Sequence, residues 1–498
     1  MSDGWRFEYH ASPGLPPLAW IARIANGVVS VDCGVSVRTE TDGFFEGTWV
    51  GPPDLTSVAE STAPFGSGMV KRGPDLFGIP PGHTMALLFS FRRGRELYLA
   101  NTLVGLLARA ELELLKDTDY QGLFALTRHG LRSSPTDLPT SGGPAQYHLF
   151  ENLRILPNGT IEKSPKRRER PFTSYADYVG RLDQALASSF ANAPGYPPVI
   201  ALSNGYDSTA VAVLAARHGL KRALTYREAR PPAFTRDPSD SGERTAMLLG
   251  LDVEFFDRTE YMRSTTLPEA EFMATGYSGE EVPYVAFENE LRHKTMLTGG
   301  LGGWAWLRAK EPFPGLERKD FSACSVTEFR LRADFIDLPI PMFGMTEAVS
   351  MSVISRSREM RPWSIGGYYD KPIARRIIEE AGIARGTFAT AKRAATALIH
   401  IEGAALMAPA SVESVRVFAA REGRVIDLSP RRRPTRLDRG LTKLARLLRV
   451  ERVAAPLAAR QRDIVHHRPQ TGSILFRWGV ANIRSRYASM EPARTRRV

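Results

Sequence analysis

The pattern of apolar and polar positions changes its character part-way along the chain. In the first part, short apolar runs such as Gly27–Val31 and Glu96–Ala100 are separated by glycines, prolines and polar turns, which is typical of a β-rich layer. From Tyr175 onward, apolar runs of strand length alternate with segments of helical spacing. This alternation predicts a parallel sheet with helices on its faces. We therefore expect an α/β chain whose amino-terminal part is β-rich, of α+β type.

A charged stretch between the two patterns marks the expected domain boundary. Residues 166–170 read K-R-R-E-R, which is typical of an exposed linker. The sequence thus predicts three parts: a β-rich domain over 1–165, a doubly wound parallel-sheet domain over 175–410, and a basic, mainly helical extension over 411–498.

The polar turn Ser203–Ser208, S-N-G-Y-D-S, follows the apolar run 197–202 and precedes apolar positions at helical spacing. A turn between a strand and a helix points several backbone N–H groups at one spot, with the positive end of the helix behind them. A carboxylate repels phosphate there unless a cation lies between them, so Asp207 favours a nucleotide phosphate together with Mg²⁺. An ordinary loop with Asp and Ser as helix caps is the alternative. The candidate phosphate-binding residues are Ser203, Asn204, Gly205, Asp207 and Ser208, with Asp207 also the candidate metal ligand.

This turn resembles the S-G-G-x-D-S pyrophosphate loop of the asparagine synthetase family, a group of ATP pyrophosphatases. Asn204 stands where the family has its first Gly, and Asn tolerates a left-handed backbone better than most residues. In the family, the next strand offers backbone groups to adenine, so Leu224 and Thr225 of the run 222–226 are expected to bind the base. The resemblance implies ATP and Mg²⁺ as cofactors, bound beyond the carboxyl ends of the strands.

A second segment, T-G-G-L-G-G-W at 298–304, is rich in glycine. Such a run lets the backbone approach an anion closely, which makes Gly299 and Gly300 candidate ATP-binding residues. The family has S-G-E-G-S-D-E or T-G-Y-G-A-D here, where the Glu or Tyr is catalytic and the Asp binds a second Mg²⁺. In this chain the first of these places falls on Gly300, and the Asp place falls on Gly303 or Trp304.

This departure from the family pattern leaves several interpretations open. The metal could be held by Asp207 and phosphate alone, or with the help of Glu280, Glu281 or Glu288. Adenylation could also have been lost. A flexible glycine loop over a core, without a binding role, is a further alternative.

A third segment, residues 359–394, places basic residues on and after a predicted helix. Lys371 and Arg375 share a helix that has an apolar stripe, and Lys392 follows after a short loop. The family similarly has a helix carrying K-y-x-l-R and then a Lys that stabilises the acyl-adenylate or the tetrahedral transition state. The resemblance makes Lys392 and Lys371 the candidate catalytic residues and Arg375 a phosphate ligand, in line with the affinity of phosphate for cations. A solvated basic face is the alternative.

The β-rich domain loosely resembles the family's amino-terminal glutamine amidotransferase domain, through the turn 157–159 that precedes the linker. The family's glutaminase uses a Cys that becomes the first residue after removal of Met. This chain has Ser2 at that place, and Cys33 lies within a strand-like run. We therefore expect a degenerate domain without glutaminase activity, similar in this respect to the beta-lactam synthetase branch.

The composition is that of a soluble globular protein, with 43% hydrophobic and 24% charged residues. There is no apolar run of membrane-span length and no signal-peptide pattern, so a cytoplasmic location is expected. The two cysteines, Cys33 and Cys324, provide neither a disulfide framework nor a cysteine metal site. The net charge of +12 is concentrated in 431–498. A basic amphipathic helix around 437–449 could contact nucleic acid, an acidic partner or an anionic membrane surface, or pack on the preceding domain.

Together these features predict an ATP-dependent, amide-forming ligase that adenylates a substrate carboxylate and transfers it to ammonia or an amine. Its partners would be a small-molecule or peptide carboxylate and the nitrogen donor. Two alternatives remain: an adenylating nucleobase or tRNA modifier on the same fold, and a catalytically degenerate nucleotide-binding or scaffold protein.

Overall fold

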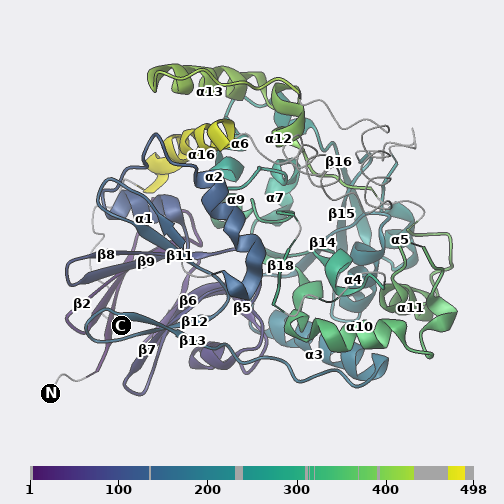
Figure 1. Ribbon diagram of the computed structural model, residues 1–498. Coiled ribbons are helices and arrows are strands. Elements are labelled where there is room, and N and C mark those ends of the chain that lie inside the picture. Colours follow the sequence, from purple (N-terminus) through teal and green to yellow (C-terminus); the bar gives the residue numbers. More distant parts are fainter. Residues whose placement is uncertain are drawn as a thin grey trace, which may run out of the picture.

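The chain consists of a β-rich part and a parallel sheet flanked by helices (Figure 1). The computed structural model describes residues 4–133, 136–229, 239–308, 312, 315–318, 320–367, 369–389, 393–430 and 469–487. The expected α/β class is confirmed. The basic helix predicted around 437–449 and Lys392 lie outside the described residues.

Two sheets build the β-rich part. In spatial order, the strands of the first are β1 (Arg6–Ala11), β3 (Val28–Cys33), β2 (Trp20–Ala25), β9 (Glu96–Ala100), β8 (Leu88–Arg93), β11 (Ala145–His148) and β10 (Thr136–Leu138). Those of the second are β13 (Ile161–Ser164), β12 (Asn152–Ile155), β7 (Asp75–Ile79), β6 (Pro64–Arg72), β5 (Gly43–Trp49) and β4 (Arg38–Glu40). Buried side chains from both sheets, such as Trp20, Phe44 and Leu153, share one core. The alternating apolar runs therefore form a sandwich.

The parallel sheet has five strands in the order β16 (Asp252–Phe256), β15 (Arg222–Tyr226), β14 (Pro198–Ala201), β17 (Lys294–Leu297) and β18 (Phe335–Leu338). All its neighbouring strands are parallel. The chain lays down β14, β15 and β16 in one direction and then β17 and β18 on the other side of β14. The space between the ends of β14 and β17 is therefore the topological switch point of a doubly wound sheet.

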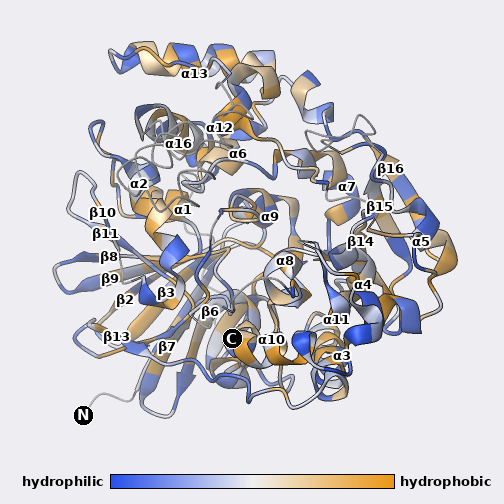
Figure 2. Cartoon of the chain, turned by 45° about the vertical axis from the view of Figure 1, so that its right-hand side comes forward, coloured by the Kyte–Doolittle hydropathy of each residue, from blue (hydrophilic) through white to orange (hydrophobic). Residues whose placement is uncertain are grey.

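The helices vary in length from one turn to more than four turns. They are α1 (Leu103–Arg109), α2 (Tyr120–Ala125), α3 (Tyr175–Ala191), α4 (Tyr206–Ala216), α5 (Glu243–Leu248), α6 (Glu269–Met273), α7 (Glu288–Leu291), α8 (Gly302–Ala305), α9 (Thr327–Ala333), α10 (Ala348–Arg356), α11 (Pro372–Glu380), α12 (Ile399–Glu402), α13 (Pro409–Arg421) and α16 (Pro469–Ile483). Figure 2 shows apolar colour on α5 at the edge of the parallel sheet, where Met247 and Leu248 are exposed. Within the described residues, none of the helices combines the length and the apolarity that crossing a membrane requires.

The expected boundary at 166–170 falls between β13 and α3, but the buried core does not stop there. The largest apolar cluster runs from Leu103 in the β-rich part to Val199 and Phe329 in the parallel-sheet part. A buried ion pair also joins them, since Arg330 of α9 donates to both carboxylate oxygens of Glu46 on β5, at 2.6 and 2.9 Å. The two parts are therefore packed as one unit.

The carboxyl-terminal helix α16 packs against α6 and α2, and a 3₁₀ turn (Arg484–Tyr487) follows it. The hydroxyls of Tyr487 and Thr102 each donate to one oxygen of the buried Glu328 on α9. Burial raises the pKa of Glu328 to about 7, although these two hydrogen bonds act in the opposite direction. This carboxyl group thus links the end of the described chain to both other parts.

We expect this group to make the protein less stable as pH rises. The folded pKa of Glu328 lies above its ordinary value of 4.5, so its contribution is fully present below that value. This stabilisation is lost as the pH rises toward 7. The loss amounts to roughly 3 kcal/mol, because a shift of one pKa unit corresponds to about 1.4 kcal/mol. The free energy of unfolding, measured with urea at several pH values, should therefore fall less between pH 5 and pH 8 in Glu328→Gln than in the wild type. The exposed Glu413→Gln on α13 serves as control, and equal slopes in all three proteins would contradict this expectation.

Candidate functional site

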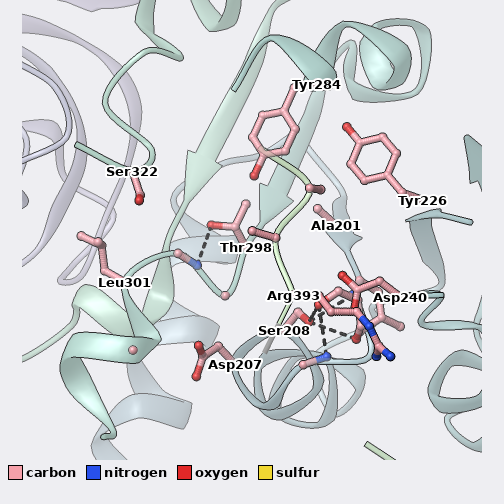
Figure 3. Close-up of a pocket in the computed structure, with 18 of the residues that line it drawn as sticks. Ala201, Asp207, Ser208, Tyr226, Asp240, Tyr284, Thr298, Leu301, Ser322 and Arg393 are labelled. Atoms are coloured by element: carbon pink, nitrogen blue, oxygen red, sulfur yellow. Dashed lines mark hydrogen bonds between the residues drawn. The ribbon is translucent and has the colours of Figure 1, made fainter. Parts of the chain in front are cut away.

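A cavity of about 330 Å³ opens at the carboxyl ends of the parallel strands. The turn after β14 and the glycine-rich loop after β17 form two of its walls (Figure 3), because these two strands are neighbours in the sheet. Doubly wound sheets bind their ligands at this place, and the volume is within the usual range for small-molecule sites. The cavity therefore lies between the first two segments that the sequence singled out.

The turn Ser203–Ser208 is held together by its own hydroxyls. The Oγ of Ser208 accepts the N–H of Ser203 at 3.1 Å and lies 3.0 Å from the Oγ of Ser203. Helix α4 begins at Tyr206, with Gly205 as its N-cap and no side chain capping its first turn. The backbone N–H groups of that first turn, with the helix dipole behind them, are what the turn offers to an anion.

Glycines bring the loop 298–303 into direct contact with this turn. A Cβ on Gly299 would lie 2.5 Å from the backbone nitrogen of Ser208, and a Cβ on Gly302 would lie 2.5 Å from the Cγ of Asp207. Atoms cannot approach so closely, so both positions require glycine. The glycine-rich loop therefore covers the Asp207 carboxylate with its backbone.

Lys371 contacts the same carboxylate. Its Nζ donates to the two oxygens of Asp207 at 2.6 and 2.5 Å, and its side chain is only 3% exposed. The sequence interpretation placed Lys371 on the helix, but it is the residue before α11, because Pro372 takes the first helical position. Since α11 packs against α4, the amino end of one helix delivers its lysine to the first turn of the other.

The groups around Asp207 do not form the set of oxygen ligands that a magnesium site requires. Mg²⁺ requires a nearly ideal octahedron of oxygen ligands, whereas both Asp207 oxygens accept from Lys371 and the backbone at Gly302 lies against the carboxylate. In the part of the chain that the structure describes, no three His, Cys, Asp or Glu side chains are grouped closely enough to hold an ion. The expected metal ligand is thus part of an ion pair.

The acidic residues offered from the sequence as further metal ligands, Glu280, Glu281 and Glu288, do not line the cavity. Glu281 accepts hydrogen bonds from two backbone N–H groups of the segment 323–325, at 2.6 and 3.1 Å. Glu288 pairs with the Arg332 guanidinium. Glu281 and Glu288 therefore serve the packing of neighbouring elements.

The end of the cavity away from the turn is aromatic. Tyr226, the last residue of β15, stacks on Phe287 with the ring centroids 4.5 Å apart, and Tyr284 lies at the same end (Figure 3). Leu224 of β15 also lines the cavity, as expected. Thr225 does not, since its hydroxyl accepts the N–H of the residue that caps α5. A wall of this kind suits a flat heterocycle.

Five charged side chains among the described residues line the cavity. They are Asp207, Asp240 and Asp320, and the cations Lys371 and Arg393. Burial raises the pKa of Asp240 to about 6, and the positive charge of Arg393 opposes this rise. The two cations and the α4 N–H groups are the groups beside the turn that can attract an anion.

Two further predicted binding residues lie behind the cavity wall. The N–H of Asn204 donates to a backbone carbonyl at 3.1 Å, and the guanidinium of Arg375 is bonded to the hydroxyl of Tyr206. The predicted catalytic Lys392 lies outside the described residues, whereas the adjacent Arg393 lines the cavity. The structure thus brings Ser203, Gly205, Asp207, Ser208, Leu224, Gly299, Gly300 and Lys371 together.

Sequence reasoning missed several residues of the cavity, mainly the aromatic ones. Tyr226 had a usable signal, because it ends the strand that supplies Leu224. Tyr284 and Phe287 come from a short 3₁₀ helix (Val282–Phe287), and Tyr369 comes from a turn. The position of such short elements depends on the packing of the whole domain, so no local pattern points to these residues.

The β-rich part offers no reactive thiol among its described residues. Burial raises the pKa of Cys33 to about 11 and, in the parallel-sheet part, that of Cys324 to about 12. Both thiols are therefore neutral near pH 7, and the thiolate is the form that acts as a nucleophile. Ser2 lies outside the described residues.

Comparison of the chain with models of known protein families gives no match, and comparison with curated proteins gives none either. The membership of the asparagine synthetase family that the motifs imply therefore stays a prediction. The function has to be argued from the cavity itself.

Replacing Gly302 with alanine is expected to destabilise the protein by roughly 1–3 kcal/mol, the usual range for overpacking. The new Cβ would meet the Asp207 carboxylate, which Lys371 holds in place. Gly303→Ala is the matched control, because its Cβ would find only the Nζ of Lys371, at 3.8 Å. The measurement is urea unfolding of both variants, and an equal loss in the two would contradict the tight fit of the loop.

Proposed function

We propose that the protein is an ATP-dependent, amide-forming ligase that adenylates a substrate carboxylate and transfers the acyl group to ammonia or an amine. The observation that carries the proposal is the cavity at the switch point of the parallel sheet. It combines an uncapped helix start, two cations and an aromatic wall. These features match the phosphates and the base of a nucleotide.

The two ends of the cavity would bind different parts of the nucleotide. The aromatic end around Tyr226 and Tyr284 would take adenine, and the end formed by the turn, Lys371 and Arg393 would take the phosphates. The lining also includes Trp304 and Ser322, which leaves a polar and an aromatic group for the carboxylate substrate. Its identity is to be found by screening.

In the proposed reaction, a carboxylate oxygen attacks the α-phosphorus of ATP, and pyrophosphate leaves with the bonding electron pair. The nitrogen of the amine then attacks the acyl carbon of the mixed anhydride, AMP leaves, and the nitrogen loses a proton. Lys371 and Arg393 supply positive charge that balances the leaving pyrophosphate and AMP. The N–H groups at the start of α4 add a fixed dipole of the same sign.

We expect the purified protein not to hydrolyse glutamine. The family's glutaminase reaction requires a thiolate next to a free α-amine, and Ser2 cannot supply a thiolate. The Cys33 thiol is neutral and buried. The measurement is glutamate release from glutamine with and without ATP. Glutamate production that disappears in Ser2→Ala would contradict the proposed degeneracy of the β-rich part.

A catalytically degenerate nucleotide-binding protein is the second candidate. The observation that favours it is the pairing of Asp207 with Lys371 beside a loop that has glycines at the places of the family's acidic residues. Both candidates bind ATP, and only the ligase turns it over.

The experiment that separates them is a screen of pyrophosphate release over a panel of carboxylates, with ammonium and simple amines as nitrogen donors. The ligase predicts release that depends on one class of carboxylate and yields AMP in equal amount. Asp207→Ala should abolish it, because the turn and Lys371 lose their shared anchor. ATP binding without any turnover over the whole panel would favour the degenerate alternative.

A further inference from the structure

A side chain of the protein, Lys371, neutralises the charge of Asp207. The Lys371 ammonium lies within hydrogen-bond distance of both oxygens of this carboxylate, and both residues line the cavity. We propose that Lys371 takes the place of a protein-bound magnesium ion, so that the site binds the phosphates of ATP without requiring a divalent cation. This inference rests on the proposed function for its ligand, ATP.

The burial of the pair argues for a permanent ion pair. The Lys371 side chain is 3% exposed and that of Asp207 is 21% exposed. An ammonium group that is removed from water needs a counter-ion, and losing the partner of a buried charge is costly. A magnesium ion on Asp207 would have to separate this lysine from its counter-ion.

The space around the carboxylate also disfavours a metal. The position of a Cβ on Gly302 lies 2.5 Å from the Cγ of Asp207 and 2.7 Å from its Oδ1, so the loop backbone covers that side. Magnesium usually keeps several of its water ligands, and these need free volume around the carboxylate oxygens. A metal ion on this carboxylate would therefore have to approach from the side that Lys371 occupies.

The lysine is also placed to face a ligand. Its Nζ lies 5.2 Å from the ring centroid of Tyr369, and a Cβ on Gly303 would lie 3.8 Å from it; all three residues line the cavity. A compact ammonium group can share its protons between a carboxylate and a phosphate oxygen. With Arg393 and the α4 N–H groups, it provides the positive charge that phosphates require.

The first arm of the test compares ATP binding with Mg²⁺ and with excess EDTA, by calorimetry on the full chain. The inference predicts dissociation constants that agree within about threefold, which is less than about 0.7 kcal/mol. Binding that weakens by more than about tenfold in EDTA would overturn it. A lack of ATP binding under both conditions would mean that the proposed function fails, and the second arm then decides the inference.

The second arm needs no nucleotide and uses Mn²⁺ as a paramagnetic probe of magnesium sites. The wild type should leave the electron paramagnetic resonance signal of free Mn²⁺ unchanged, whereas Lys371→Met frees the Asp207 carboxylate and should reduce that signal. The double variant Asp207→Asn, Lys371→Met should again leave it unchanged. Arg222→Met, which removes a cation from an exposed ion-pair cluster at the far end of β15, is the matched control.

The wild type decides the inference even where a variant does not fold, and circular dichroism checks the fold of each protein. The double variant avoids the uncompensated carboxylate of Lys371→Met, because it removes both charges. One Mn²⁺ bound by the wild type and lost in Asp207→Asn would overturn the inference. Mn²⁺ binding that appears only when Lys371 is replaced would support it.

Discussion

Replacing Arg330 with methionine should lower the free energy of unfolding by about 3–5 kcal/mol, the cost of breaking a buried ion pair on one side. The side chain of Glu46 is fully buried and that of Arg330 is 9% exposed. The carboxylate also accepts the Ser67 hydroxyl at 2.8 Å, which does not replace the lost charge. Because this pair joins β5 to α9, urea unfolding of the variant measures how strongly the β-rich part and the parallel-sheet part depend on each other.

Two further variants distinguish the loss of the buried ion pair from a general loss of charge. Arg154 pairs with Asp75 on the surface of the β-rich part, where the two side chains are 43% and 35% exposed. Arg154→Met should therefore change the free energy of unfolding very little. The double replacement Glu46→Met, Arg330→Met should regain part of the loss, because it removes both buried charges. A loss as small as that of Arg154→Met would contradict the importance of the buried pair.

Replacing Lys371 with alanine should lower turnover about a hundred- to a thousandfold once a substrate is known, the usual effect of losing one preorganised group that stabilises transition-state charge. Two hydrogen bonds to Asp207 hold the Lys371 ammonium group against the turn. Lys371→Arg should restore little activity, because a planar guanidinium does not fit the place of a compact ammonium group. The measurement is the rate of pyrophosphate release.

Arg385→Ala serves as the control for this prediction. Arg385 follows α11, is half-exposed, and pairs with Glu379 outside the cavity. Its loss should leave turnover close to that of the wild type. Equal turnover in Lys371→Ala and the wild type would reduce Lys371 to a structural ion pair and remove it from the proposed chemistry.

The elements with a clear period could be predicted from the sequence. The strand expected over 222–226 is β15, which begins at Arg222 and ends at Tyr226. The turn Ser203–Ser208 lies between a buried strand and a helix as its pattern indicated. Local spacing suffices here, because a strand, a tight turn and a helix start each depend on nearby residues.

The partners of the candidate residues could not be predicted, because they depend on contacts between distant segments. The ion pair of Asp207 with Lys371 requires the packing of α11 on α4. The same packing turns Arg375 toward the hydroxyl of Tyr206 and away from the cavity. The sequence identified basic residues that suit phosphate, but it did not show which of them would face it.

The central claim is that the cavity between β14 and β17 binds ATP. A calorimetric titration of ATP into the wild type and into Gly302→Ala tests it most directly, since the added Cβ would displace the Asp207 carboxylate from its place against the loop. The account predicts saturable binding of one ATP per chain in the wild type and binding weaker by about tenfold or more, roughly 1.4 kcal/mol, in the variant. No binding to the wild type, or equal affinity in the two proteins, would contradict it.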